Sequence, residues 1–190
     1  MSETTTSYPA ARTVQLGVNH AEDRVVLVCD TAQHGRRAAW LTRRLMRRLL
    51  NRYAGFLADS NPTAAQAGPG HREDILQMEH LSALAEESAD DDTAGTGDAP
   101  GEPPDHFLVT EAHFQNRGST IVLALDGVAR PGAATSHTGR EAVLAVSLAR
   151  TDAHRLLDMF KRKADEAAWD LPAPSAWTEP PSGGRSGTVN

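Results

Sequence analysis

The stretch WLTRRLMRRLLNRYAGFLA, residues 40–58, combines regularly spaced apolar residues with several arginines. Its apolar side chains recur every three or four residues, which places them on one face of a helix. The main ones are Leu45, Leu49, Tyr53 and Phe56. Thr42 stands just before them and is a candidate N-cap, because its hydroxyl can accept a hydrogen bond from a free amide at the helix start. The stretch therefore predicts an amphipathic helix over residues 43–58.

Strand patterns precede this helix. Residues 13–19 alternate apolar and polar side chains, as a half-buried strand does, and residues 24–30 form a more continuous apolar run. The turn residues between the two runs predict a hairpin. A short third strand is expected at residues 38–41. Together these elements predict an N-terminal ββ(β)α segment over residues 13–60.

The same order of patterns returns later in the chain. Residues 106–115 and 119–126 alternate around a turn that contains Gly118, and residues 141–149 predict a third strand. A helix capped by Thr151 is expected to follow, to about residue 169. The C-terminal βββα segment therefore covers residues 106–170. The expected fold class is α+β, with one or more antiparallel sheets and amphipathic helices packed on one face.

Strict alternation in the first strand of this segment assigns its side chains to two faces. Phe107, Val109, Glu111 and His113 fall on one face, and Ala112 and Phe114 fall on the other.

The repeated order suggests a duplicated βββα unit, with two halves related by approximate twofold symmetry. Residues 41–53 aligned with residues 148–160 share five identities in thirteen positions. Short helices rich in Arg and Leu also match by chance, so both readings stay open.

The remaining segments are expected to be linkers and tails. Residues 1–12 predict a disordered lead, and residues 61–105 predict an acidic linker with a conditional helix at residues 73–87. Within that helix, Ile75, Met78, Leu81 and Leu84 stand at helical spacing. Residues 171–190 predict a disordered tail rich in Pro and Gly.

Charge is strongly segregated along the chain, whose net charge is −6. Residues 1–60 hold nine arginines and five acidic residues, a net charge of +4, whereas residues 61–106 hold one arginine and eleven acidic residues, a net charge of −10. No stretch is apolar enough to cross a membrane, and no secretory signal is evident. Cys29 is the only cysteine. We therefore expect a cytoplasmic protein without an internal disulfide.

An arginine-rich face is the strongest functional signal. Its candidate partner-binding residues are Arg36, Arg37, Arg43, Arg44, Arg47, Arg48 and Arg52. Guanidinium groups gathered on one side of a helix can bind an acidic protein partner, the acidic linker of the same chain, or nucleic-acid phosphates. The alternative without a function is a solvated helix face whose arginine stems cover the edge of the core.

Trp177 is a further candidate for partner binding. It is the one large aromatic residue in the extended, proline-rich segment at residues 172–181. Such a segment can place an aromatic side chain in a groove of a partner, or can simply be a solvated tail.

Signatures of catalysis are missing from the sequence. The histidines do not have metal-ligand spacing, no G-x-S-x-G turn is present, and no glycine-rich phosphate loop follows a strand. We therefore predict no catalytic residues, no metal and no cofactor, and lean against an enzyme. The predicted function is an adaptor, assembly factor or accessory subunit that binds a protein partner or forms a homo-oligomer through its helices. A nucleic-acid-binding accessory protein is the alternative, and an enzyme without a recognisable motif is the third.

Overall fold

The computed structural model describes residues 7–90, 103–130 and 139–179. Its strands are β1 (Gln15–Asn19), β2 (Arg24–Thr31), β3 (Gly35–Leu41), β4 (Asp105–Arg117), β5 (Thr120–Ala129) and β6 (Arg140–Leu148). Its helices are α1 (Arg43–Asp59), α2 (Pro62–Gln66), α3 (Pro69–Asp90) and α4 (Arg150–Glu166), and η2 (Ala176–Thr178) is a short 3-10 helix. The expected α+β fold class is confirmed.

The strands form one mixed sheet in the order β1-β2-β3-β4-β5-β6. Neighbours within each set of three are antiparallel, whereas β3 and β4 run parallel and join the two sets. At the far end, Ala10 forms a parallel bridge with Ala145 of β6. Backbone hydrogen bonds of 2.9 and 2.8 Å on either side of Ala145 make this bridge, so part of the β6 edge is already paired.

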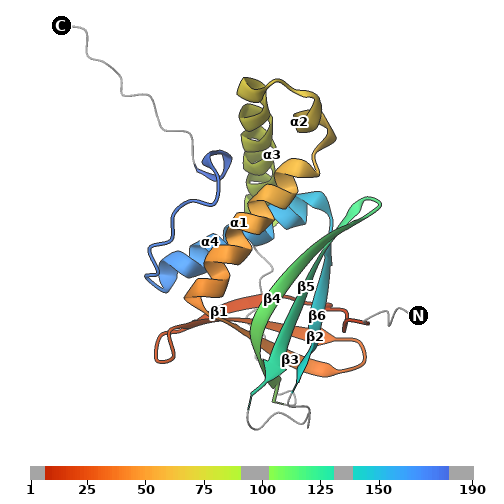
Figure 1. Ribbon diagram of the computed structural model, residues 1–190, viewed down its shortest axis with the longest axis vertical. Helices are drawn as coiled ribbons and strands as arrows, with labels where there is room; N and C mark the ends of the chain where they lie inside the picture. Colours follow the sequence, from red (N-terminus) through yellow and green to blue (C-terminus); the bar gives the residue numbers. More distant parts are fainter. Residues whose placement is uncertain (1–6, 91–102, 131–138, 180–190) are drawn as a thin grey trace, which may run out of the picture.

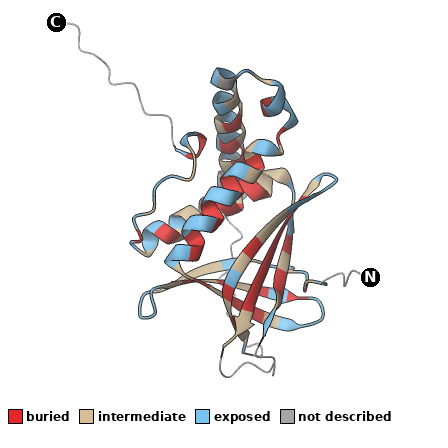
Figure 2. Cartoon of the chain, viewed as in Figure 1, coloured by how far each residue is buried: buried red, intermediate tan, exposed pale blue. Residues whose placement is uncertain are grey.

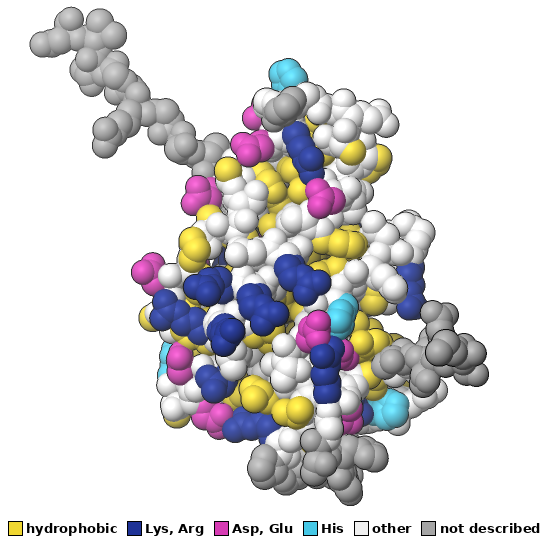
Figure 3. All heavy atoms as spheres, viewed as in Figure 1, with side chains coloured by type: hydrophobic (Ala, Val, Ile, Leu, Met, Phe, Trp, Pro, Cys, Tyr) yellow, Lys and Arg dark blue, Asp and Glu magenta, His cyan; other side chains and the backbone are white. Residues whose placement is uncertain are grey.

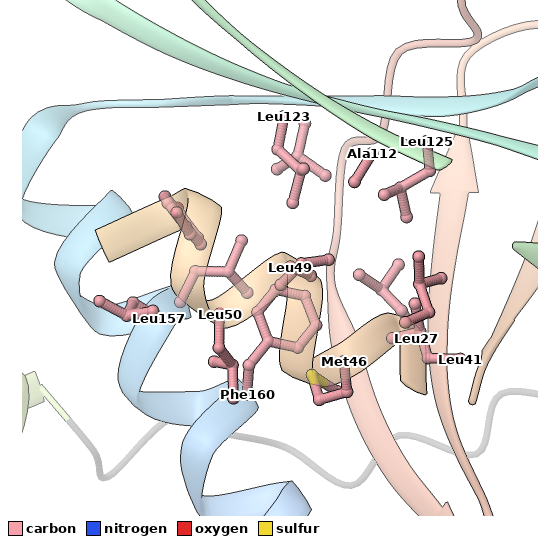
Figure 4. Close-up of a cluster of buried hydrophobic side chains, with 14 of the residues drawn as sticks. Leu27, Leu41, Met46, Leu49, Leu50, Ala112, Leu123, Leu125, Leu157 and Phe160 are labelled. Atoms are coloured by element: carbon pink, nitrogen blue, oxygen red, sulfur yellow. The ribbon is translucent and has the colours of Figure 1, made fainter. Parts of the chain in front are cut away.

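Helices α1 and α4 pack together against the strongly twisted sheet, and α3 projects away from it (Figure 1). The helix faces turned toward the sheet and toward each other are the buried ones (Figure 2). Leu49 and Leu50 of α1 and Phe160 of α4 lie opposite Leu123 and Leu125 of β5 in this core (Figure 4). The two helices therefore share one hydrophobic core with the sheet.

Helix α1 forms as the sequence predicts. The Thr42 hydroxyl accepts a hydrogen bond from the Leu45 amide at 3.1 Å, which caps the helix. Its apolar face is buried, at Leu45, Met46, Leu49, Leu50, Tyr53, Ala54 and Leu57. The start of α4 differs from the prediction, because Ala149 rather than Thr151 is the N-cap.

A bulge in β4 overturns the predicted faces of that strand. The register with β5 shifts between Val109 and Glu111, so one extra residue enters β4 at this point. Phe107, Val109 and Ala112 are consequently all buried in the core, although strict alternation assigned Ala112 to the other face. Glu111 and His113 are instead partly exposed on the outer face, where the candidate groove described below lies.

The segment predicted as a linker contains more structure than expected. Helix α2 and the full length of α3 lie within residues 61–90. The buried residues of α3 are Leu76, His80 and Ala83, whereas the predicted positions Met78 and Leu81 are 70 % and 40 % exposed. Of the other two predicted positions, Ile75 packs against the core and Leu84 is half-buried, so the sequence pattern is right for one edge of the buried face and wrong for Met78 and Leu81. Residues 91–102, where a disordered linker was predicted, lie outside the described residues.

The start of the predicted tail also differs from the expectation. Trp177 is only 3 % exposed, and the Lys161 ammonium donates to the Thr178 carbonyl at 2.6 Å. A large aromatic ring has enough apolar area to hold this short segment on the helices. Within the described residues, no helix is long and apolar enough to span a membrane. The predictions for residues 1–6 and 180–190 lie outside the described residues.

Candidate functional site: the arginine surface of helix α1

Five exposed arginines cover the face of α1 that is turned away from the core. We call Arg43, Arg44, Arg47, Arg48 and Arg52 the arginine surface. Figure 3 shows Lys and Arg side chains gathered in the middle of the face that α1 presents in Figure 1. The spacing Arg44, Arg48, Arg52 repeats every four residues, so successive charges in this row are about 6 Å apart along the helix axis.

None of these five side chains has an ion pair or a hydrogen bond with another described residue. Helix α4 offers an internal comparison, because three of its basic side chains pair with carboxylates of the same helix. Arg155 pairs with Asp152 at 3.1 Å, Arg162 with Asp158 at 2.8 Å, and Lys163 with Glu166 at 2.6 Å. The only acidic residue in α1 is Asp59, which pairs with Arg72 at 2.8 Å. Among the described residues, the arginine surface is therefore a positive patch without paired carboxylates.

Three predicted binding residues lie elsewhere. Arg36 is half-buried on β3, in the sheet and not on α1. Arg37 is buried and donates to the backbone carbonyls of Ala142 and Val143 at 3.2 and 2.7 Å, with its guanidinium 4.8 Å from the Phe107 ring centre. Arg37 thus ties β3 to β6. Trp177 is buried against two histidines and offers no exposed ring to a partner.

A partly buried polar network joins α3, α4 and Asn61, the N-cap of α2, and sequence reasoning missed it. The Glu79 carboxylate pairs with the Arg150 guanidinium and accepts a hydrogen bond from the Asn61 amide at 2.8 Å. His154 is fully buried, with its Nε2 atom 3.3 Å from Glu79 and its Nδ1 atom 3.3 Å from Nδ1 of His80. Burial raises the pKa of Glu79, but the nearby His154 and hydrogen bonds from Arg150 and Asn61 outweigh that effect and lower it to about 2. This network attaches α3 to the rest of the fold.

A second polar cluster lies on the outer face of β4 and β5. Asp126 accepts a hydrogen bond from Arg140 at 2.8 Å and contacts His113 Nε2 at 3.0 Å, and Arg140 also pairs with Glu111. Burial raises the Asp126 pKa, but these bonds and one from Tyr8 lower it overall. Burial and the bond to Asp126 raise the pKa of Tyr8 to about 12. The ligand atoms of Glu111, His113 and Asp126 lie within 4.8 Å of one another, close enough to hold a metal ion. Arg140 already supplies a positive charge to both carboxylates.

Cys29 has the properties of a core residue. It is 1 % exposed, and burial raises the pKa of its thiol to about 11. A thiol with this pKa is almost entirely protonated at neutral pH, so it is a poor nucleophile.

Comparison of the chain with protein-family models, curated proteins and solved structures finds no match.

Proposed function

We propose that this protein is a non-catalytic interaction protein, an adaptor, assembly factor or accessory subunit, that binds an acidic protein partner through the arginine surface of α1. The observation that carries the proposal is the contrast between the two core helices. Three basic side chains of α4, Arg155, Arg162 and Lys163, are paired with carboxylates of their own helix, whereas the five arginines of the arginine surface have no described partner. Five adjacent guanidinium groups repel one another, and a carboxylate-rich partner relieves that repulsion.

An acidic protein is favoured over nucleic acid by the charge of the rest of the chain. The net charge is −6 although the arginine surface is positive, and residues 61–106 alone contribute −10 from one arginine and eleven acidic residues. A polyanion such as DNA is repelled by this acidic remainder, and its long-range attraction to the arginine surface is reduced. A protein partner whose carboxylates are gathered in one patch presents them to the arginine surface alone and avoids most of this repulsion. Nucleic-acid binding is the second candidate, supported by the absence of described ion pairs on the arginine surface.

We also infer that the segments 13–60 and 106–170 are two copies of one βββα unit. The order of three strands and a helix occurs in both. The third strand of each segment also has a parallel neighbour: β3 pairs with β4, and β6 forms an isolated bridge with Ala10, which lies five residues before β1. A parallel neighbour at both positions supports the inference of an approximate twofold relation. On this inference α1 and α4 are equivalent helices that differ in that the arginines of α1, unlike Arg155 and Arg162 of α4, have no ion pair with a described residue.

The double substitution Arg44→Glu and Arg48→Glu tests the proposed function. Both side chains are exposed, so the variant should fold with the parent's melting temperature. Protein captured from the native extract by the tagged parent, and identified by mass spectrometry, should be lost with this variant because attraction becomes repulsion. The matched control is Arg12→Glu with Arg24→Glu, which makes the same change of charge on the sheet and should retain the partner.

Nuclease treatment and added salt separate the two candidates. With a protein partner, capture should survive nuclease treatment and weaken modestly as salt is added. With nucleic acid, capture should be lost on nuclease treatment and should fall steeply with salt, because each neutralised phosphate releases counterions. Equal capture by the parent and the Arg44→Glu, Arg48→Glu variant would contradict both candidates and leave the arginine surface as ordinary solvated helix.

A further inference from the structure

A groove lies on the outer face of β4, β5 and β6, on the side of the sheet opposite the helices. Its volume is about 670 Å³, within the range of about 300–1,000 Å³ that is typical of small-molecule sites. The bulge in β4 creates it, because the shift between Val109 and Glu111 turns His113 and Gln115 to this face.

The floor of the groove consists of small apolar side chains. Val122 and Ala124 of β5 and Ala145 of β6 line it, and Ala124 is directly opposite Ala145 in the register. Val122 and Ala124 are 7 % and 8 % exposed although no helix covers this face. A ligand body that rests here covers apolar surface and needs no polar atoms at its centre.

The wall formed by β4 is polar and basic. His113, Gln115 and Arg117 occupy alternate positions of the strand, a distance of about 14 Å from first to last. Arg117 is exposed, and its Nε atom donates to the Gln115 side chain at 3.1 Å. Arg117 forms no ion pair within the described part of the chain, and no carboxylate is among the described residues that line the groove.

The opposite end of the groove is held in a fixed arrangement. Tyr8 and His113 both bond to Asp126, which is 7 % exposed and also bonded to Arg140. Arg140 pairs with Glu111 as well, so the nearby carboxylates are compensated and do not repel an anion at the Arg117 end.

We propose that this groove binds a small organic carboxylate whose apolar body lies on Ala124 and Ala145 and whose carboxylate pairs with Arg117. A guanidinium group matches a carboxylate through two parallel hydrogen bonds. One uncompensated arginine balances the single charge of a carboxylate, whereas a phosphate monoester carries close to two negative charges at neutral pH. The length of the wall accommodates a ligand of about 14 Å or less.

Two probes of the same shape and opposite charge test the proposal, namely 4-phenylbutanoate and 4-phenylbutylamine. Titration of the isotope-labelled full chain, followed by amide chemical shifts, should give saturable changes at residues 113–117, 122–124 and 145–147 with the carboxylate alone. Arg117→Gln should weaken that binding about tenfold or more, because it removes one charge-assisted pair. Arg48→Gln removes the same charge from the arginine surface and should leave the affinity unchanged.

A second variant keeps the test independent of charge. Ala124→Leu fills the floor of the groove and should abolish binding of 4-phenylbutanoate while Arg117 is intact. The proposal is overturned if the carboxylate gives no saturable change at millimolar concentration. It is equally overturned if the amine binds as well as the carboxylate, or if Arg117→Gln and Ala124→Leu both bind like the parent.

Discussion

The Nδ1 atoms of His80 and His154 lie 3.3 Å apart across the contact between α3 and α4. At this distance one ring donates and the other accepts, so at least one of the two imidazoles must be neutral. His80 is 2 % exposed and His154 is fully buried. The Trp177 ring packs against both histidines, with its centre 5.5 Å from that of His80 and 5.6 Å from that of His154. Three separate elements therefore pack around a histidine pair in which at least one ring is neutral.

Acidification should destabilise the protein through this histidine contact as the pH falls from 6.5 to about 4. Burial, and then the nearby His154, lower the pKa of His80 from 6.5 to about 4. Between these values the unfolded chain binds more protons than the folded one, so the free energy of unfolding falls as the pH falls from 6.5 to 4. The expected loss is on the order of 3 kcal/mol. Glu79 adds a further loss as the pH falls from 4.5 to about 2, because its carboxyl is protonated in the unfolded chain before it is protonated in the folded one.

Urea unfolding measured at several pH values checks this prediction. His80→Phe removes the titrating group, so the slope of stability against pH between 6.5 and 4 should become shallower whatever the variant's stability at neutral pH. The control His34→Gln changes an exposed histidine in the turn after β2 and should keep the parent's slope. A slope in His80→Phe as steep as the parent's would show that this histidine contact does not cause the acid sensitivity.

Trp177 should hold residues 171–179 on the helices. Trp177→Ala removes a ring that is 3 % exposed and leaves a cavity beside the two histidines, at a cost of about 3 kcal/mol. We expect a lower melting temperature and faster proteolysis after residue 170. Trp177→Phe keeps an aromatic ring and should lose less than half as much stability. Parent-like melting of Trp177→Ala would contradict the role of this ring.

Elements whose buried face follows a regular spacing could be predicted from the sequence. The prediction fails where one extra residue interrupts that spacing. Apolar spacing alone identifies α1 and its buried Leu49 and Tyr53, because a helix exposes or buries side chains by position. The extra residue in β4 has no such signal, so alternation assigned His113 to the same face as Phe107. His80 likewise faces inward through a tertiary hydrogen bond with a residue 74 positions away, which no local pattern records.

The seven arginines predicted to bind a partner were also only partly placed by the sequence pattern. The five of the arginine surface were placed correctly, but Arg37 was not. The exposure of the arginine surface follows from the helix period, so Arg44 and Arg48 were correctly placed opposite the core. Arg37 stands next to Arg36 in the sequence and looks equivalent to it, but strand alternation sends its side chain into the interior. Only the structure distinguishes the two.

Gly127 should be intolerant of any side chain. A Cβ atom at this position would lie 2.5 Å from the backbone oxygen of Leu108, which is closer than such atoms approach in folded proteins. Gly127→Ala should therefore cost about 1–3 kcal/mol, because the two strands must separate beside the bulge. Thermal unfolding measures the effect.

Gly55→Ala is the matched control for that substitution. Gly55 is exposed on α1 and has no heavy atom within 4 Å of the added methyl group. The same chemical change should therefore stabilise the protein by about 1 kcal/mol through helix propensity. Equal effects of the two substitutions would mean that β4 and β5 do not approach closely at the bulge.

Arg37 and its neighbour Arg36 should respond to the same substitution to very different extents. Arg37→Met preserves most of the side-chain volume but leaves the Ala142 and Val143 carbonyls without their donor, and it removes the cation from the Phe107 ring. The expected cost is about 1–3 kcal/mol, because buried acceptors that lose a partner are not rehydrated. Arg36→Met alters a half-buried side chain with no such role and should stay within about 0.5 kcal/mol of the parent. Urea unfolding of both variants measures these costs, and capture of the partner by each should match the parent after correction for the folded fraction. If Arg37→Met proved as stable as the parent yet lost the partner, Arg37 would belong to the binding surface. Its assigned role as a structural link between β3 and β6 would then be wrong.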